Sequence, residues 1–209
     1  MNPDDYISLH TSPEPELLKE VERSTFLRHV YPRMCCGHVQ GRLLSMLTHM
    51  QRPHRLLEIG TFTGYATLCL AEAMPEGACI HTIEIDDEKE DELRATFARS
   101  PRRADISLHI GDALELIPAL PGDWDLALID ADKRLYCDYY DLLLPRMAPG
   151  GIIIADNTLW GGKITESDTV PGDPQSIGIM KFNNQAASDK RVETVMLPLR
   201  DGLTIIRVK

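Results

Sequence analysis

Two short polar groups in this chain each follow an apolar run. Asp130 to Lys133 follows residues 126–129, and Asp156 with Asn157 follows residues 152–155. Each run has the length and composition of a buried parallel strand. Because ligands bind at the carboxyl ends of strands in open α/β sheets, we expect the two groups to meet at one edge of a sheet.

The atoms in these groups suit a metal-assisted reaction. Asp130 and Asp156 offer carboxylate oxygens and Asn157 an amide oxygen, which are ligands for a hard cation such as Mg²⁺ or Ca²⁺. Lys133 is placed to accept a proton once its pKa is depressed. The alternatives are ordinary ones, since aspartate and asparagine also cap strand ends and form turns, and a lysine is usually a solvated charge.

Composition narrows the class of protein. With 209 residues, 43% of them hydrophobic, the chain is long enough for one well-buried core. We expect a single domain over residues 1–209, with a helical segment at 1–52 and the α/β core at 53–209. A formal net charge of −10 argues against a nucleic-acid partner and favours a small substrate.

The location of the protein is predicted from targeting segments and cysteine patterns that are absent from the sequence. The first residues do not resemble a signal or transit peptide, and no apolar run approaches the length of a membrane helix, so no membrane partner is expected. The five cysteines include no C-x-x-C pair, and an odd number fits a disulfide framework poorly. A cytoplasmic protein is therefore predicted.

The order of apolar runs predicts an α/β fold. Two helices are expected before the sheet, one capped by Ser12 and a second that ends at Gln51. Beyond them, short apolar runs alternate with amphipathic stretches, which is the βαβ rhythm of a parallel sheet with right-handed crossovers. The expected strands are 56–59, 79–85, 106–110, 126–129 and 152–155, followed by an antiparallel hairpin of 192–197 and 203–208. Residues 158–175 form the longest expected loop, a candidate lid.

The turn after the first strand is a candidate ligand loop. Gly60 allows a sharp turn and close approach of the backbone to a ligand, and the following helix offers free amide donors. An ordinary strand-to-helix turn is the alternative, because the spacing is not that of the G-x-G-x-x-G fingerprint. Glu84, at the end of the second strand, is placed to bind both hydroxyls of a ribose. Asp112, at a helix start, is expected either to cap the helix or to contact an adenine.

Four motifs in this order resemble the cation-dependent O-methyltransferases of the caffeoyl-CoA and catechol type. They lie at Leu57 to Tyr65, Asp130 to Lys133, Gly150 to Trp160 and Leu197 to Ile205. The resemblance implies a Rossmann-like class I methyltransferase fold, with a central seven-stranded, mostly parallel sheet, one antiparallel strand, helices on both faces and extra N-terminal helices. It also implies S-adenosylmethionine as methyl donor, a divalent cation (Mg²⁺ first, with Ca²⁺ or Mn²⁺ as alternatives), a vicinal aromatic diol as acceptor, and a homodimer.

The resemblance assigns a role to each matching residue. Asp130, Asp156 and Asn157 hold the metal, and Lys133 is the general base, with Asp130 also catalytic. The cofactor residues are Glu58, Gly60 and Tyr65 at the methionine end, Glu84 at the ribose, Asp112 and Ala113 at the adenine, and Asp130. Met34 and Trp160 border the acceptor, with plain packing as the alternative for the tryptophan. The implied reaction is attack of a phenolate oxygen on the sulfonium methyl, with the proton passing to Lys133.

The segment from Cys35 to Gly41 departs from the plant-type pattern and leaves the acceptor open. A soft-metal site at Cys35, Cys36 and His38 is not favoured, because adjacent cysteines rarely give that geometry and buried cysteine behaves as a small hydrophobe.

The acceptor expected from the lid segment is a free catechol or another small diol. Its acidic residues, Glu166, Asp168 and Asp173, fit the anionic tail of a CoA thioester poorly. Two other classes stay open on sequence alone: a nicotinamide-dependent oxidoreductase of Rossmann type, and a non-catalytic cofactor-binding module.

Overall fold

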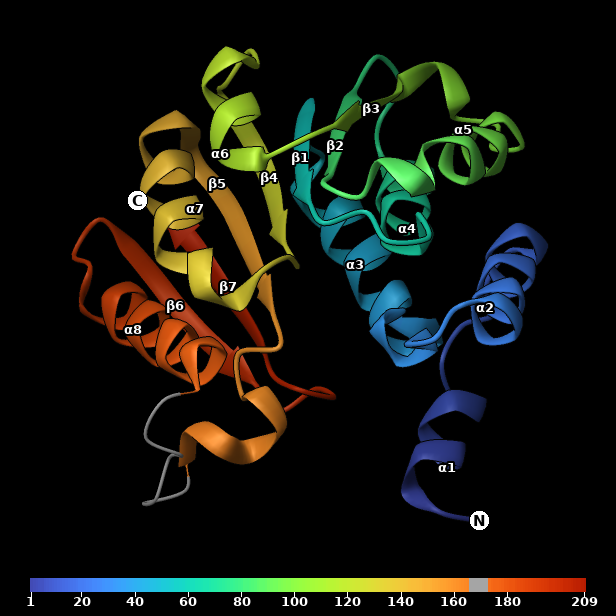
Figure 1. The fold of residues 1–209 in the computed structure, drawn as a ribbon, viewed down its shortest axis with the longest axis horizontal. Coiled ribbons are helices and arrows are strands. Elements are labelled where there is room, and N and C mark those ends of the chain that lie inside the picture. The colour runs from blue at the N-terminus through green and yellow to red at the C-terminus, as the bar shows by residue number, and fades with distance from the viewer. Residues whose placement is uncertain (166–172) are drawn as a thin grey trace.

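Seven strands of the described residues form one sheet in the order β3-β2-β1-β4-β5-β7-β6 (Figure 1). The structure is a computed structural model that describes residues 1–165 and 173–209. The strands are β1 (Arg55–Ile59), β2 (Cys79–Glu84), β3 (Ile106–Ile110), β4 (Trp124–Ile129), β5 (Met147–Asp156), β6 (Val192–Leu197) and β7 (Leu203–Val208). Only β7 runs antiparallel to its neighbours, β5 and β6. The predicted fold class is confirmed.

Helices cover both faces of this sheet. They are α1 (Pro3–Leu9), α2 (Glu16–Arg28), α3 (Gly37–Gln51), α4 (Tyr65–Ala73), α5 (Glu90–Ala98), α6 (Ala113–Leu116), α7 (Tyr136–Leu143) and α8 (Pro174–Ser188). Short 3-10 turns join them: η1 (Pro32–Met34), η2 (Asp87–Lys89), η3 (Arg103–Asp105), η4 (Ile117–Ala119), η5 (Lys133–Leu135), η6 (Leu144–Arg146) and η7 (Trp160–Thr165). One core lies between the sheet and α6, α7 and α8, and a second between the sheet and α2 to α5.

The two cores explain why the central strands are continuous apolar runs. Neighbouring residues of a strand point to opposite faces, so Leu57 enters the core under α7 and α8 while Leu56 enters the core under α3 and α4. Both are fully buried. A parallel sheet covered on both faces favours apolar residues along its central strands, and the buried polar exceptions Glu58 and Thr82 bond to each other.

The predicted strands agree with the structure to within two residues except at β5, with β1 beginning at Arg55 and β4 at Trp124. The expected segment 152–155 is the last part of a strand that begins at Met147. Pro149 and Gly150 interrupt the apolar pattern there, and both residue types are uncommon inside strands. The pairing of β4 with β5 also shifts its register between Trp124 and Leu126. The strand predicted at 79–85 ends one residue early, at Glu84.

The N-terminal helices differ from the prediction. Ser12 caps no helix, because α2 begins at Glu16 with Pro15 at its N-cap position. Pro15 disfavours helical backbone at Glu14, the residue before it, and this excludes a helix that starts at Pro13. An additional helix, α1, is capped by Asn2, whose Oδ1 accepts a hydrogen bond of 2.8 Å from the backbone N–H of Asp5. Since α1 buries none of its residues, it has no apolar face that the sequence could reveal.

The candidate lid is described only in part. Its first residues form η7, and Asp173 caps α8. Glu166 and Asp168 lie outside the described residues. Within residues 1–165 and 173–209, no helix combines the length and the apolar composition needed to cross a bilayer.

Candidate active site

The carboxyl ends of three central strands lie side by side. The registers of β1 with β4 and of β4 with β5 place Gly60, Asp130 and Asp156 next to one another at one edge of the sheet. Gly60 has a positive φ of 95°, and a Cβ there would lie 2.0 Å from the backbone oxygen of Asp130. Only glycine therefore lets the two strand ends approach this closely. The two polar groups of the sequence meet at this edge, as predicted.

Lys133 is buried beside the first of these carboxylates. Its Nζ donates hydrogen bonds to Asp130 Oδ1 at 2.8 Å and to Tyr136 Oη at 2.9 Å, and the residue is 6% exposed. The Tyr136 hydroxyl in turn donates to the backbone oxygen of Asp156 at 2.9 Å. One lysine and one tyrosine thus tie the ends of β4 and β5 together.

The surroundings of Lys133 act on its pKa in opposite directions. Burial disfavours the ammonium form, but the negative charge of Asp130 and the Tyr136 hydroxyl outweigh it and hold the pKa of Lys133 above its usual range. Among the described residues alone the pKa of Lys133 is therefore not depressed, and its ammonium group pairs with Asp130 at 2.8 Å.

Asp156 is held in a different environment. Its Oδ2 accepts a hydrogen bond from Gln40 Nε2 at 2.6 Å, its Oδ1 accepts one from the Asn157 N–H at 2.7 Å, and it is 5% exposed. Burial, followed by the negative charge of Asp130, raises the pKa of Asp156. The two carboxylates are therefore close enough to repel each other in a site with little solvent.

These residues fit a hard divalent cation. A shared cation removes the repulsion between two neighbouring carboxylates, and its preferred ligands are oxygens. Asn157 follows directly, with a φ of 57° in the left-handed region that asparagine tolerates better than most residues. Among the described residues no three of His, Cys, Asp and Glu gather into a metal cluster. The set at this edge instead consists of two carboxylates and an amide.

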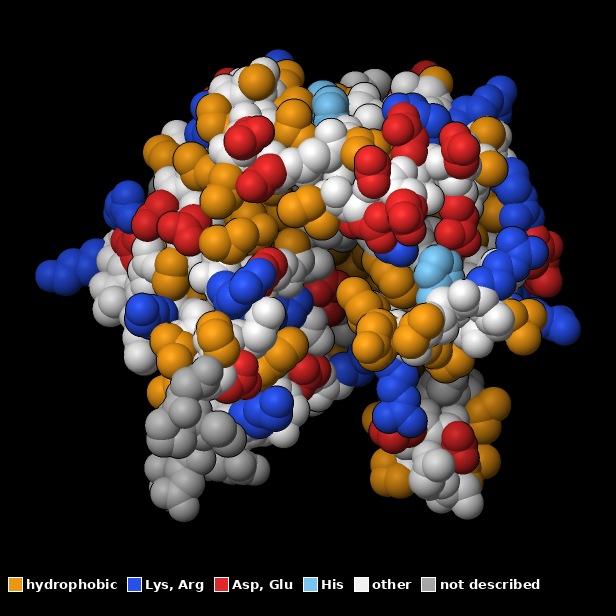
Figure 2. All heavy atoms as spheres, in the orientation of Figure 1, with side chains coloured by type: hydrophobic (Ala, Val, Ile, Leu, Met, Phe, Trp, Pro, Cys, Tyr) orange, Lys and Arg blue, Asp and Glu red, His pale blue; other side chains and the backbone are white. Residues whose placement is uncertain are grey.

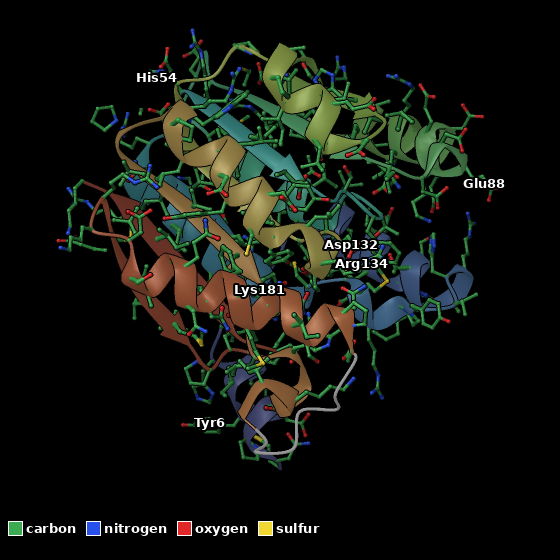
Figure 3. All side chains as sticks on the ribbon, turned by 60° about the vertical axis from the view of Figure 1, so that its left-hand side comes forward. Tyr6, His54, Glu88, Asp132, Arg134 and Lys181 are labelled. Atoms are coloured by element: carbon green, nitrogen blue, oxygen red, sulfur yellow. The ribbon has the colours of Figure 1, made fainter. Side chains whose placement is uncertain are left out.

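Asp132 takes no part in this group. It caps η5, with Oδ1 accepting a hydrogen bond from the Arg134 N–H at 3.0 Å, and it pairs with the Arg134 guanidinium. Figure 3 shows these two residues together at this end of the sheet, with His54, which precedes β1, at the far end.

A cavity of about 430 Å³ opens beside Asp130, above the ends of β1, β2 and β4. Its wall includes the predicted residues Gly60, Glu84, Ala113, Asp130 and Met34. The other lining residues are Ile59, Phe62, Ile83, Ile85, Asp86, Lys89, Gly111, Ala131, Asp132, Leu135 and Tyr139. Figure 2 shows a hollow near the middle of the molecule, bordered by hydrophobic side chains. The mixture of apolar walls and carboxylates suits a ligand with both a ring and hydroxyl groups.

Glu84 fixes the floor of this cavity. Its Oε2 accepts hydrogen bonds from the N–H groups of Thr61 (3.2 Å) and Phe62 (2.7 Å), and its Oε1 accepts one from Asp86 (3.0 Å). The carboxylate thus holds the glycine turn against the end of β2. Phe62 has a positive φ of 54°, and Lys89 Nζ lies 5.5 Å from the centre of its ring.

Three predicted cofactor residues do not line this cavity: Tyr65, which borders a smaller hollow, and Glu58 and Asp112, which lie behind the surface. Glu58 is completely buried, where its carboxylate accepts hydrogen bonds from the hydroxyls of Thr67 and Thr82, the second at 2.6 Å. Burial raises the pKa of Glu58 to about 8. Asp112 caps α6 by accepting a hydrogen bond of 2.8 Å from the Leu114 N–H, the capping alternative named from the sequence.

A second, smaller hollow adjoins Asp130 on the side of the N-terminal helices. Met34, Gly60, Tyr65 and Asp130 line it together with Cys35, Cys36, Thr61, Phe62, Thr63 and Ala66. Tyr65 donates its hydroxyl hydrogen bond to Glu14. Trp160 lies outside both cavities, in η7, where Lys163 Nζ is 5.8 Å from its ring.

Several residues of the site carried no recognisable pattern in the sequence. Gln40 contacts Asp156 across 116 positions of sequence, and Tyr136 bridges two strand ends from a helix. Phe62 lies inside the motif from Leu57 to Tyr65, and it differs from its neighbours there by its positive φ, which the residue type does not indicate. Lys89 is one of many charged residues in its segment. Such contacts depend on tertiary packing rather than on local spacing.

The sequence as a whole is similar to proteins of known type. Residues 8–209 match the family described as O-methyltransferase. The chain is 33% identical over 203 residues to caffeoyl-CoA O-methyltransferase from Stellaria longipes, covering 93% of this chain and 84% of that protein. It is also 33% identical over 204 residues to tricin synthase 2 from Oryza sativa, covering 93% and 70%.

Solved structures agree with the sequence comparisons. The O-methyltransferase from Bacillus cereus, solved with SAH, superposes with a TM-score of 0.90 at 28% identity, covering 99% of this chain and 96% of that one. The O-methyltransferase TomG from Streptomyces achromogenes, solved with SAM, gives a TM-score of 0.88 at 27% identity, covering 99% and 95%.

Proposed function

Because the chain belongs to the O-methyltransferase family, we propose that it methylates one hydroxyl of a vicinal aromatic diol with the help of a divalent cation. It is an S-adenosylmethionine-dependent O-methyltransferase, which sets aside a nicotinamide oxidoreductase and a non-catalytic module. The cation and the diol are the parts that we propose. The observation that carries them is the pair of carboxylates at one sheet edge, Asp156 buried and Asp130 partly exposed, with a buried lysine beside Asp130.

Asp130, Asp156 and Asn157 would hold the cation. Asp156 is kept in place by Gln40, whose second amide atom, Oε1, is buried with no hydrogen-bond donor among the described residues. A bound divalent cation would favour the ionised form of an acceptor hydroxyl, as a Lewis acid. We assign Mg²⁺ first, because the ligands are all oxygens.

Lys133 is the proposed acceptor of the hydroxyl proton, on condition that a divalent cation bound beside Asp130 lowers the pKa of the lysine by charge repulsion. Its Nζ lies against Asp130 and is fixed by Tyr136, so its position does not depend on a mobile side chain. The reacting hydroxyl must then approach the carboxylate pair from the cavity side. Tyr136 serves as a positioning residue, because it holds Lys133 on one side and the end of β5 on the other.

S-adenosylmethionine fits the larger cavity by its chemical parts. We propose that Glu84 accepts hydrogen bonds from the ribose hydroxyls, that Ala113 lies near the adenine, and that Gly60 and Tyr65 are at the methionine end. Asp112 and Glu58 would act from behind this surface, Asp112 by capping α6 and Glu58 by supporting the end of β1. Fixing donor and acceptor in line contributes most to such a transfer, up to roughly 7 to 11 kcal/mol.

The acceptor is proposed at the level of an aromatic diol. Relatives named for caffeoyl-CoA and for tricin share the family, so membership does not select among acceptors. Met34, which lines both cavities, is proposed to contact the ring, and Trp160 to border it from η7. A small diol without a CoA tail is the first choice because the chain is acidic overall, with a formal charge of −10.

Calorimetry with Mg²⁺ tests the proposed cation site. We expect the wild-type protein to bind Mg²⁺ and Asp156→Asn to bind it much more weakly. Asp132→Asn is the matched control, because Asp132 is an aspartate of the same sheet edge that pairs with Arg134 instead. Equal Mg²⁺ binding by all three proteins would refute the assignment of Asp156.

We also propose that the protein is a homodimer that uses its N-terminal helices. Phe26 and Leu27 of α2, with Val30 and Tyr31 after it, expose large apolar side chains close together in sequence. A patch of this kind is more typical of an interface than of a free surface. Light scattering after gel filtration measures the mass directly, and the mass of a single chain, 23.5 kDa, would refute the proposal.

A further inference from the structure

The turn between β6 and β7 contains an arginine in a backbone conformation that favours glycine. Leu199 to Gly202 forms the turn, closed by a hydrogen bond of 2.9 Å from the Gly202 N–H to the Leu199 oxygen. Arg200 has a φ of 49°, in the left-handed region. A long side chain at such a position is unfavourable for the backbone, so its contacts require an explanation.

The Arg200 side chain reaches a segment more than 160 positions away in sequence. Its Nη1 donates hydrogen bonds to the backbone oxygens of Cys35, at 2.7 Å, and of Cys36, and its Nη2 donates one to the oxygen of Arg33 at 2.9 Å. In Figure 1 this turn reaches away from the sheet toward the start of α3. One guanidinium thus binds three carbonyls of the connection between η1 and α3. Its planar fork of donors suits this use, and a lysine lacks that fork.

The segment that Arg200 binds forms a wall of the site. Met34 lines both cavities, and Cys35 and Cys36 line the smaller one beside Asp130. The segment is otherwise joined by short turns of its own, such as the bond from the Cys35 N–H to the Pro32 oxygen. Cys35 and Cys36 are also buried in the core under α2 to α5, so the arginine adds the side-chain hydrogen bonds that join this segment to the hairpin turn.

The same turn also holds the chain that follows Asn157. The oxygens of Asp201 and Gly202 accept hydrogen bonds from the N–H groups of Leu159 (2.8 Å) and Thr158 (3.0 Å). The Asp201 carboxylate accepts a further one from the Gly161 N–H. Backbone bonds thus tie this side of the turn to the segment that contains Trp160.

We propose that Arg200 is a positioning residue that sets the separation between the two walls of the acceptor site, residues 33–36 and 158–161. It touches neither the donor nor the reacting atoms. Its effect is expected mainly on the acceptor, because the ribose side of the larger cavity, at Glu84, is built from β1, β2 and their turn. Met34, Cys35 and Cys36 also border the smaller hollow proposed for the methionine end, so any loss of SAH affinity should be smaller than the change in acceptor KM. The inference rests on the proposed function only in taking a diol as the acceptor. The coupling of residues 33–36 to residues 158–161 does not depend on the proposed function.

Three variants test this role. Arg200→Gly removes the side chain and suits the positive φ, so the backbone does not lose stability at the turn. Arg200→Lys keeps the charge, but one ammonium cannot replace the fork that spans three carbonyls. Arg207→Ala is the control, because Arg207 also lies on the hairpin and is exposed, but pairs only with Glu193 at 3.2 Å.

Hydrogen–deuterium exchange, SAH calorimetry and steady-state kinetics with a catechol are measured on all four proteins. In Arg200→Gly we expect faster exchange in peptides covering 32–37 and 157–162, and an acceptor KM raised about tenfold, since tenfold corresponds to roughly the 1.4 kcal/mol of one good interaction. SAH affinity and exchange elsewhere should stay within about twofold of wild type, a change below 0.5 kcal/mol. Arg200→Lys should lie between, and Arg207→Ala should match wild type.

The results separate this inference from the proposed function. Unchanged exchange in the two peptides, or an unchanged acceptor KM despite faster exchange, would overturn the role of Arg200. A loss of SAH affinity equal to the change in KM would also overturn it, because it would indicate general destabilisation. If the wild-type protein methylates no diol, the proposed acceptor is wrong, and the exchange data with the SAH affinities still decide whether Arg200 couples the two walls.

Discussion

Alanine at position 178 would test how Lys133 is held. Gly178 lies in α8 where this helix crosses η5, and a Cβ there would lie 2.3 Å from the Lys133 oxygen and 2.8 Å from the Arg134 Cα. Both neighbours are backbone atoms, so neither can turn aside as a side chain would. The change Gly178→Ala must therefore push α8 and η5 apart.

The size of the effect follows from these distances. Ordinary carbon–oxygen contact is at least about 3.4 Å, so η5 must move by roughly 1 Å relative to α8. A misplacement of about 1 Å at a reacting group can lower a rate on the order of 100-fold. Stability should change less, because overpacking costs about 1 to 3 kcal/mol while replacing a helical glycine by alanine gains about 1 kcal/mol.

The assay is the initial rate of methyl transfer to a catechol at saturating S-adenosylmethionine. We expect kcat of Gly178→Ala to fall about 100-fold and SAH affinity to fall much less, because η5 contributes only Leu135 to one wall of the cofactor cavity, whereas Gly60 and Glu84 belong to the ends of β1 and β2. Asn184→Ala is the control, since it introduces alanine at an exposed position of the same helix. Urea denaturation of each protein confirms that it is folded.

A folded Gly178→Ala protein with kcat within about twofold of wild type would refute the reasoning, because η5 would then have moved without consequence for the reaction. A parallel loss of SAH affinity would refute it as well, since the displacement would not be confined to Lys133.

Three further changes are expected. Asp156→Ala should abolish turnover and leave SAH affinity largely intact; an equal loss of SAH binding in calorimetry would contradict the separation of roles. Gly60→Ala should prevent both SAH binding and turnover, because its Cβ would lie 2.0 Å from a backbone oxygen, and normal SAH affinity would show that the strand ends can separate freely. Burial lowers the pKa of His81 and of His109, so the unfolded chain binds more protons below the usual histidine pKa. Relative to His81→Gln, the wild-type protein should therefore lose stability to urea as the pH drops from 7.5 to 5, while the raised pKa of Glu58 acts in the opposite direction in both proteins; equal slopes would contradict this origin.

Much of the fold was predictable because burial on both faces imposes a simple pattern. The runs at 106–110, 192–197 and 203–208 agree with β3, β6 and β7 residue for residue. The sheet edge carries the polar groups that follow the runs at 126–129 and 152–155. The start of β5 was not predictable, since Pro149 and Gly150 are retained there by pairing with neighbouring strands. Helix α1 buries no side chain, so its apolar residues show no helical pattern.

The candidate site was predictable where chemistry and strand ends coincide. Asp130, Lys133 and Asp156 lie together as expected. Gln40 and Arg200 were not predictable, because each reaches its partner across more than 100 positions, and glutamine and arginine are common surface residues. Their roles depend on tertiary packing, which the local spacing of residues in the sequence does not indicate.

Transfer of a radiolabelled methyl group from S-adenosylmethionine to catechol, with and without EDTA, tests the central claim most directly. Phenol, which has a single hydroxyl, is the matched acceptor. The account predicts that catechol is methylated, that EDTA stops the transfer, that added Mg²⁺ restores it, and that phenol is not methylated. Methylation of catechol at the same rate in EDTA, or of phenol as readily as catechol, would contradict a cation held by Asp130, Asp156 and Asn157.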